Sequence, residues 1–255
     1  TMYILKDFFE KTIKSNHLMS RPENYYVNLN ERNNYLFNTS IEGIEESDFI
    51  LLIGANPRIE ATILNSRIRK SYLKNKTKIY SLGDVGDLTY PYQILKNNTK
   101  TIRDIVEDKH ELSKKIKNSI KPSIIIGQST LQLKSAAYIF EEIKKFLILN
   151  NKVNQEWNSL NILSNNASTV GAYDLNIGNF ENSIDTLNKL KDNYFDIVFL
   201  FGQDDIEFKK LNSYIVYVGS HGDKGAEQAD LILPGAAYTE QDGYFTNLEG
   251  KIQKA

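Results

Sequence analysis

The stretch SDFILLIGANPRIEATILNSRIRKSYLKNKTKIYSLG, residues 47–83, decides the fold. Within it, Phe49–Ile53 is an uninterrupted apolar run, which is typical of a strand buried on both faces of a parallel sheet. Gly54 ends this run, and Lys78–Leu82 has the composition of a second strand. The stretch therefore predicts a strand–helix–strand unit.

The segment between the two strands has the features of a helix. Asn56 is a suitable cap, and Pro57 suits a first turn, where its missing N–H has no cost. Apolar residues follow at helical spacing: Ile59, Ile63, Leu64 and Ile68. Three basic residues are expected to complement the negative C-terminal end of this helix: Arg67, Arg69 and Lys70.

The same alternation recurs along the chain. Further strands are predicted at Pro122–Thr130 (closed by Gly127), 160–165, 195–204 and 214–220, with helices at Leu131–Leu149 and 181–193. Alternating strands and helices predict a doubly wound α/β fold, with a mostly parallel sheet and helices on both faces. We expect residues 1–255 to form one such region or two closely packed lobes.

Both ends of the chain have readable patterns. The first residues place Ile4, Leu5, Phe8, Phe9 and Ile13 near helical spacing, which predicts a helix with a core-facing stripe. Asp230–Pro234 reads as a short buried strand, and the residues after it resemble a hairpin with 247–250 in the turn.

Composition excludes several kinds of function. With 31 basic and 32 acidic residues the net charge is −1, which does not favour a nucleic-acid or anionic-membrane partner. The chain has no cysteine, so it offers no disulfide, no thiolate nucleophile and no cysteine cage for an iron–sulfur cluster. The histidines His17, His110 and His221 lack metal-ligand spacing. No apolar run approaches the ~20 residues of a membrane span.

Two glycine turns are the candidate sites. Gly54, Asn56 and Arg58 lie where a strand meets a helix, and exposed N–H groups there can hold an anion. The segment matches neither the dinucleotide fingerprint nor a P-loop, and most parallel strands end in such a turn for backbone reasons alone. A purely structural turn is therefore the favoured interpretation.

The second turn is the loop 219–225. Gly219, His221 and Gly222 are candidates there, but the nearby Ser220, Asp223, Lys224 and Glu227 fit no nucleophile–base arrangement. A histidine in such a loop is more often bonded to backbone than catalytic. Glu240 and Asp242 follow the loop with no sign that they converge. We expect no catalytic residue, no metal ligand and no bound cofactor, and treat the six turn residues as vestigial candidates.

Three long motifs make the sequence recognisable: FILLIGANPRIEATILNSRIRKSYL at Phe49–Leu73, GDVGDLTYPY at Gly83–Tyr92, and the stretch from Gly219 to Gln253. With YLFNTSIEGIEESD at Tyr35–Asp48, they resemble the molybdopterin-oxidoreductase-like C-terminal domain of the large iron–sulfur subunit of mitochondrial respiratory complex I, the NADH:ubiquinone oxidoreductase. The likeness covers almost the whole chain.

The resemblance implies a domain without a pterin or chemistry of its own, in an assembly that couples NADH oxidation to ubiquinone reduction and proton pumping. Iron–sulfur clusters and FMN would belong to partner subunits. The expected partners are the cluster-bearing half of the same subunit and other peripheral-arm and accessory subunits. Because the cysteine-rich half is missing from this sequence, we expect a divided subunit, with that half either a separate polypeptide or part of a portion not represented here. The implied location is peripheral, on the matrix side of the mitochondrial inner membrane, with a bacterial cytoplasmic version as the alternative.

Three functions stay open at this point. The first is a structural domain of the peripheral arm, which the missing cysteines favour. The second is a fragment of an active molybdopterin-dinucleotide-dependent oxidoreductase, with the Gly54 turn at one phosphate and the Gly219–Gly225 loop at the other. The third is a free-standing nucleotide-binding or regulatory module.

Overall fold

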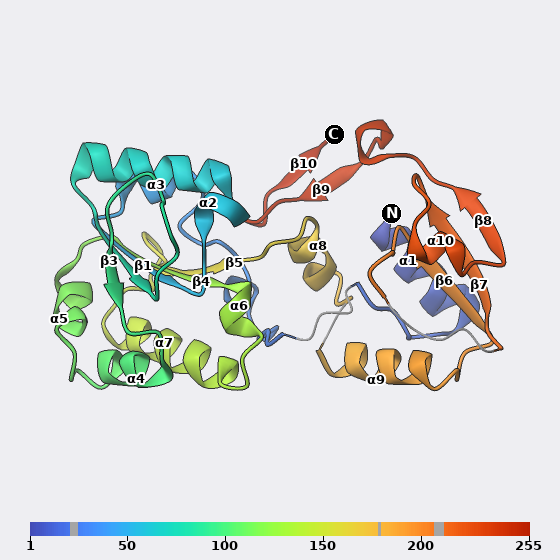
Figure 1. The fold of residues 1–255 in the computed structure, drawn as a ribbon, viewed down its shortest axis with the longest axis horizontal. Helices are drawn as coiled ribbons and strands as arrows, with labels where there is room; N and C mark the ends of the chain where they lie inside the picture. The colour runs from blue at the N-terminus through green and yellow to red at the C-terminus, as the bar shows by residue number, and fades with distance from the viewer. Residues whose placement is uncertain (21–24, 178–179, 207–211) are drawn as a thin grey trace. The chain divides into compact units, whose positions relative to one another are not determined.

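The structure is a computed structural model that describes every residue except 21–24, 178–179 and 207–211 (Figure 1). Contacts divide the chain into two compact units. The first, called the five-stranded unit, comprises Tyr25–Val170 and Thr246–Lys251. The second, called the three-stranded unit, comprises Thr1–Asn24, Gly171–Phe245 and Ile252–Ala255.

Strand β1 (Phe49–Ile53) is the centre of the five-stranded sheet, and all of its residues are buried. Strands β2 (Lys78–Leu82) and β4 (Pro122–Gly127) pair with it on either side, both parallel to it. Strands β3 (Gln93–Leu95) and β5 (Leu160–Leu163) extend the sheet, giving the order β3-β2-β1-β4-β5 (Figure 1). The predicted parallel sheet is confirmed.

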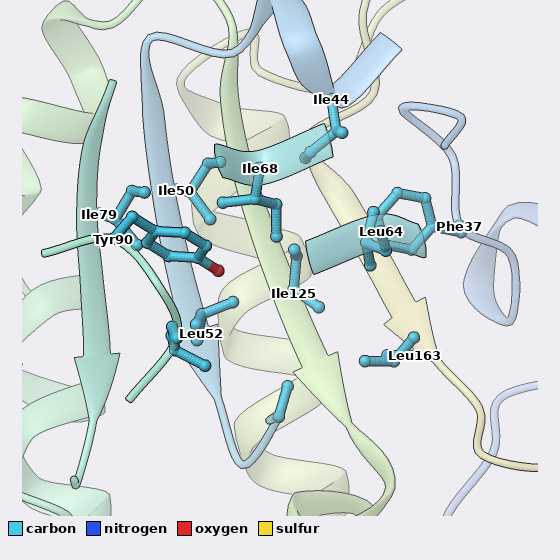
Figure 2. Close-up of a cluster of buried hydrophobic side chains, with 12 residues drawn as sticks. Phe37, Ile44, Ile50, Leu52, Leu64, Ile68, Ile79, Tyr90, Ile125 and Leu163 are labelled. Atoms are coloured by element: carbon cyan, nitrogen blue, oxygen red, sulfur yellow. The ribbon is translucent and has the colours of Figure 1, made fainter. Parts of the chain in front are cut away.

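Helices cover both faces of this sheet because its strands are apolar on both faces. Ile50 and Leu52 of β1 pack against Leu64 and Ile68 of α3 (Thr62–Asn75) in a buried cluster shown in Figure 2. Their neighbours Leu51 and Ile53 point the other way, since successive strand residues alternate. That second face is covered by α4 (Thr99–Val106), α5 (Glu111–Asn118) and α7 (Ala136–Leu149). The doubly wound α/β class is therefore confirmed.

Two predicted helices are each interrupted. Ala61 has non-helical backbone angles, φ −153° and ψ 71°, and it separates α2 (Pro57–Glu60) from α3. Ile59 and Ile63 are consequently exposed, so the predicted four-residue stripe was wrong at these two positions. Arg67 and Lys70 lie inside α3 and pair with Glu45, at 2.5 and 2.9 Å, not with a helix end.

The second interrupted helix was predicted as Leu131–Leu149. It is divided between α6 (Gln128–Leu131) and α7, with a non-helical connection between them. Buried residues of α7, including Ile143, Phe146 and Leu147, close the second face of the sheet.

The three-stranded unit has a parallel sheet in the order β6-β7-β8, formed by Ile197–Phe201, Tyr214–Gly219 and Leu231–Pro234. Its helices include α9 (Phe180–Lys191) and α10 (Lys224–Glu227), and α8 (Thr169–Asp174) lies at the boundary between the units. Leu200, Ile215 and Tyr217 form its buried centre.

Burial in this unit differs from the predictions. All four residues of β8 are exposed, so the buried strand predicted at Asp230–Pro234 was wrong in its burial. Strand β8 is exposed because it lies at the edge of its sheet. An apolar run in the sequence does not reveal whether a helix covers the strand.

The N-terminal helix is present as α1 (Met2–Phe8), followed by a π-helical turn, η1 (Phe9–Ile13). Its predicted core-facing stripe was wrong in part, since Ile4, Phe8 and Ile13 are exposed while Leu5 and Phe9 are half-buried. Within α1 only Leu5 is among the half-buried residues of the stripe, and the π-helical turn changes the 3.6-residue period only for Ile13, the last residue of that turn.

The predicted C-terminal hairpin is confirmed. Strands β9 (Tyr244–Thr246) and β10 (Ile252–Lys254) pair, and the Gly250 N–H donates to the Asn247 carbonyl at 3.0 Å. The turn belongs to the five-stranded unit. There the Phe37 N–H donates to the Leu248 carbonyl at 3.0 Å, and Arg32 donates to the Gly250 carbonyl at 2.9 Å. Within the described ranges, each helix falls short of the length or apolarity that a bilayer crossing requires.

Candidate functional site

The carboxyl ends of β1 and β4 are where the strand order of the five-stranded sheet reverses direction. In doubly wound folds, ligands bind in the crevice outside this switch point. Gly54 directly follows β1, with φ +58°, and Gly127 is the last residue of β4. The first group of predicted candidates therefore lies where the fold would place a ligand site.

The two glycine turns are in contact with each other. A Cβ atom on Gly127 would overlap the Gly54 carbonyl and lie 2.8 Å from the Ala55 Cα. A Cβ on Gly54 would lie 2.6 Å from the Ser129 hydroxyl, which itself donates to the Gly54 carbonyl at 2.7 Å. Glycine is therefore required at both positions because the two turns approach each other so closely. This steric reason explains the glycines without a ligand.

Several polar groups of the Gly54 turn are engaged within the protein, although the buried Asn56 side-chain oxygen accepts no hydrogen bond from a described residue. The Asn56 side-chain amide donates to the Val85 carbonyl at 2.9 Å, instead of capping α2 as predicted. Arg58 donates to the Asp87 carbonyl at 2.6 Å and forms an ion pair with the Asp87 carboxylate. The Asn56 N–H donates to the Glu60 carboxylate at 3.2 Å.

Two carboxylates respond in opposite ways to these surroundings. Burial raises the pKa of Glu60, and the Asn56 N–H opposes that shift only partly. The Thr89 N–H, and after it Arg58, lower the pKa of Asp87. Asp87 is thus charged when it forms a surface ion pair with Arg58, the cation that an anionic ligand at this turn would use.

The loop 83–92, which carries the GDVGDLTYPY motif, is fixed by a buried network. The Tyr90 hydroxyl donates to the Asn65 carbonyl oxygen at 2.7 Å, and the Asn65 amide donates to the Leu88 carbonyl at 3.0 Å. Tyr92 accepts the Val85 N–H at 3.1 Å and donates to Asp84 at 2.8 Å. The motif therefore holds its own loop against α3 and the Gly54 turn.

The loop 219–225 is organised around Tyr217 in the three-stranded unit. The Tyr217 hydroxyl oxygen lies 2.6 Å from the His221 carbonyl oxygen and 3.0 Å from the Asp204 carboxylate, so its single proton can be donated to either acceptor. A Cβ on Gly219 would lie 2.6 Å from that hydroxyl. Burial first, and then the hydrogen bond to Asp204, raise the pKa of Tyr217. Glycine at 219 is explained by this tyrosine.

The charged residues of the same loop are structural. Asp223 caps α10 by accepting the Lys224 N–H at 2.9 Å. The exposed His221 ring contacts the Ser220 hydroxyl at 2.9 Å, and a Cβ on Gly222 would make only an ordinary contact, 3.5 Å from Ala226. The Ser220 hydroxyl thus meets a histidine ring, but among the described contacts no third group orients that exposed ring, as a nucleophile–base pair in an active site requires.

The candidates thus fall into two groups in different units, one at Gly54, Asn56 and Arg58 and one at Gly219, His221 and Gly222. Glu240 accepts the Ala237 N–H at 2.9 Å, in the short helix η4 (Tyr238–Glu240). Among the described residues, no group of three histidine, aspartate or glutamate side chains is placed to hold a metal ion. Sequence reasoning missed Asp87, Asp204 and Tyr217, which lie outside the candidate turns and meet them only in the folded chain.

Residues 1–255 match the molybdopterin oxidoreductase family. The chain is 42% identical over 228 residues to the NADH-ubiquinone oxidoreductase 75 kDa subunit of Reclinomonas americana, covering 89% of this chain and 33% of that protein. It is 40% identical to an NADH-quinone oxidoreductase subunit of Rickettsia bellii, over 100% of this chain and 36% of that one.

A plant protein, the mitochondrial NADH dehydrogenase [ubiquinone] iron-sulfur protein 1 of Solanum tuberosum, is 34% identical over 99% of this chain and 34% of its own length. The chain spans about a third of the length of these relatives. The resemblance read from the motifs is confirmed. Because the family match extends over all of its residues, the chain belongs to the molybdopterin oxidoreductase family.

Proposed function

We propose that this chain is a structural, non-catalytic part of an NADH:quinone oxidoreductase of the respiratory complex I type. The observation that carries the proposal is the engagement of both glycine turns by the protein itself. Gly127 and Ser129 occupy the approach to Gly54, Asp87 pairs with Arg58, and Tyr217 occupies the approach to Gly219. These contacts support a structural role for both turns.

The residues present do not fit a molybdopterin dinucleotide. Its phosphates would need free N–H groups or cations at the turns, but Asn56 and Arg58 are paired within the five-stranded unit. A molybdenum ion usually takes a cysteine, selenocysteine or serine ligand in this family; the chain has no cysteine, and none of its serines lies in a matching motif. We therefore assign no step of any reaction to this chain.

The assembly follows from the relatives, whose names describe NADH-ubiquinone and NADH-quinone oxidoreductase subunits. In our proposal, electrons pass through iron–sulfur clusters and FMN held by other parts of that assembly. This chain would support the cluster-bearing part as one molybdopterin-oxidoreductase-like region spanning residues 1–255. Its place would be peripheral, on the matrix side of the mitochondrial inner membrane.

Exposed apolar side chains support a packing role. Tyr238, Tyr244 and Ile252 are 83%, 77% and 69% exposed, and the whole of the edge strand β8 is exposed. Large exposed apolar groups and uncovered strand edges are typical of surfaces that other chains cover. The other peripheral-arm subunits are the proposed neighbours.

The test is turnover of the intact assembly with Arg58→Gln and His221→Ala. Removing a general acid or base typically costs about 10²–10⁴ in rate, so a catalytic role for either residue would be plain. We expect NADH:quinone reductase turnover per assembled complex to stay unchanged in both variants. A loss of about a hundredfold or more, with normal assembly, would contradict the proposal.

A further inference from the structure

The three-stranded unit contains a cavity of about 280 Å³ between its N-terminal segment and strand β6. Met2, Leu5 and Phe9 line it from the N-terminal helical segment, and Leu190 of α9 and Phe199 of β6 also line it. Phe9 and Phe199 contact each other edge to face, with ring centroids 5.5 Å apart. The volume is close to the lower end of the range for small-molecule sites, roughly 300–1,000 Å³.

The lining of this cavity is adaptable and mostly apolar, with Ser15, His17, Ser20, Thr186 and Gln203 as its polar members. Both methionines of the chain, Met2 and Met19, lie in it. Methionine is flexible and polarizable, and it suits surfaces that accommodate apolar ligands. The lining contains no aspartate, glutamate, lysine or arginine among the described residues, and His17 packs its ring against Phe195 with centroids 5.0 Å apart.

One polar group in this lining has no partner. Gln203 follows β6 and lines the cavity, and its side-chain Nε2 is buried without a hydrogen-bond acceptor among the described residues. A buried amide donor without an acceptor is unfavourable and uncommon in native proteins. An acceptor atom brought by a ligand would satisfy it.

We propose that this cavity binds a small, neutral, largely apolar molecule that presents one carbonyl oxygen to the Gln203 amide. The apolar walls bury the body of the molecule, and Gln203 fixes the position of its oxygen. A carboxylate is excluded as the buried group, because the described lining has no cationic lysine or arginine to offset the cost of burying a charge. The site is separate from both glycine turns and does not depend on the proposed structural function.

The probe is benzophenone, a neutral aromatic ketone that inserts into nearby C–H bonds on irradiation. The full chain, in the form in which it is purified, is labelled at increasing probe concentration, and adducts are mapped by peptide mass spectrometry. We expect saturable labelling concentrated on Met2, Met19 and Phe199. Gln203→Leu should raise the half-saturating concentration by up to about tenfold, the effect of one lost hydrogen bond.

Two matched pairs of variants make the result decisive. Leu5→Trp should fill the cavity and abolish the mapped adducts, whereas Leu73→Trp, at an exposed position of α3, should not. Gln132→Leu makes the same substitution as Gln203→Leu at an exposed site and should leave labelling unchanged. Adducts spread over exposed apolar residues, or equal half-saturation for wild type and Gln203→Leu, would overturn the proposal.

Discussion

Gly127 and Gly54 are in backbone contact, so closely that a Cβ on Gly127 would overlap the Gly54 carbonyl oxygen. The contact joins the carboxyl ends of two central parallel strands, β4 and β1. In a doubly wound fold this is the place for a ligand. In this chain the backbones of Gly54 and Gly127 contact each other at that position.

Gly127→Ala should therefore destabilise the five-stranded unit by roughly 2–3 kcal/mol, because neither strand can move away from the added methyl group. Gly86→Ala is the comparison, since its Cβ would meet nothing within 4 Å and only its φ of +78° is strained. That change should cost about 1 kcal/mol. The single tryptophan, Trp157, bonds to the Pro122 carbonyl and reports unfolding of this unit by fluorescence in urea. Equal costs for the two variants would contradict the steric account.

Tyr90→Phe should destabilise the same unit by about 1–3 kcal/mol, because it leaves the buried Asn65 carbonyl oxygen without its donor. The double variant Tyr90→Phe/Asn65→Leu should cost clearly less than the sum of the two single changes, since both remove one shared bond. Urea unfolding followed by Trp157 fluorescence measures all three. Strict additivity would show that the two side chains act independently.

Glu60→Gln should stabilise the protein at neutral pH. Burial raises the pKa of Glu60, so the folded state disfavours the charged carboxylate. As pH rises through the folded pKa, Glu60 loses its proton and the folded protein loses the stability that the protonated form gave it. The gain from glutamine should shrink below about pH 4, where the unfolded carboxyl is also protonated. Thermal unfolding of both proteins across pH 3–8 checks this. If Glu60→Gln were less stable than wild type at pH 7, the prediction that the charged carboxylate destabilises the folded protein would be wrong.

Glu249→Gln should have the opposite effect. Burial alone would raise the pKa of Glu249, but Lys251, the Ile41 N–H and Asn247 together lower it. Its stabilisation is therefore present above the unfolded pKa of about 4 and is lost as pH falls through the folded value. The same pH series should show the glutamine variant less stable at pH 7 and close to wild type in acid. A gap that persists at low pH would point to a cause other than charge.

The five-stranded sheet could be predicted because its signal is local. Phe49–Ile53 is apolar throughout and ends at a glycine, which suits a strand covered on both faces. Strand β8 has a similar local signal but is exposed. Its burial depends on its edge position and on what covers it, which four apolar residues do not encode.

The candidate turns could be located from the sequence, but the sequence did not reveal whether other residues of the chain fill them. The groups that engage Asn56 and Arg58 lie 29 residues further along the chain, at Val85 and Asp87. Tyr217 is part of a strand and gives no sign in the sequence that its hydroxyl reaches the His221 carbonyl. Whether a glycine turn is open or filled is decided by hydrogen bonds that depend on packing, both long-range ones such as Asn56 to Val85 and short-range ones such as Tyr217 to His221.

The most direct test of the structural role is the molybdenum and pterin content of the native protein, purified with the assembly to which it belongs. Molybdenum is measured by elemental analysis, pterin by fluorescence after denaturation, and iron in the same digest shows that bound metals were retained. The filled turns predict neither molybdenum nor pterin in stoichiometric amount. One molybdenum or one pterin per chain would contradict the account.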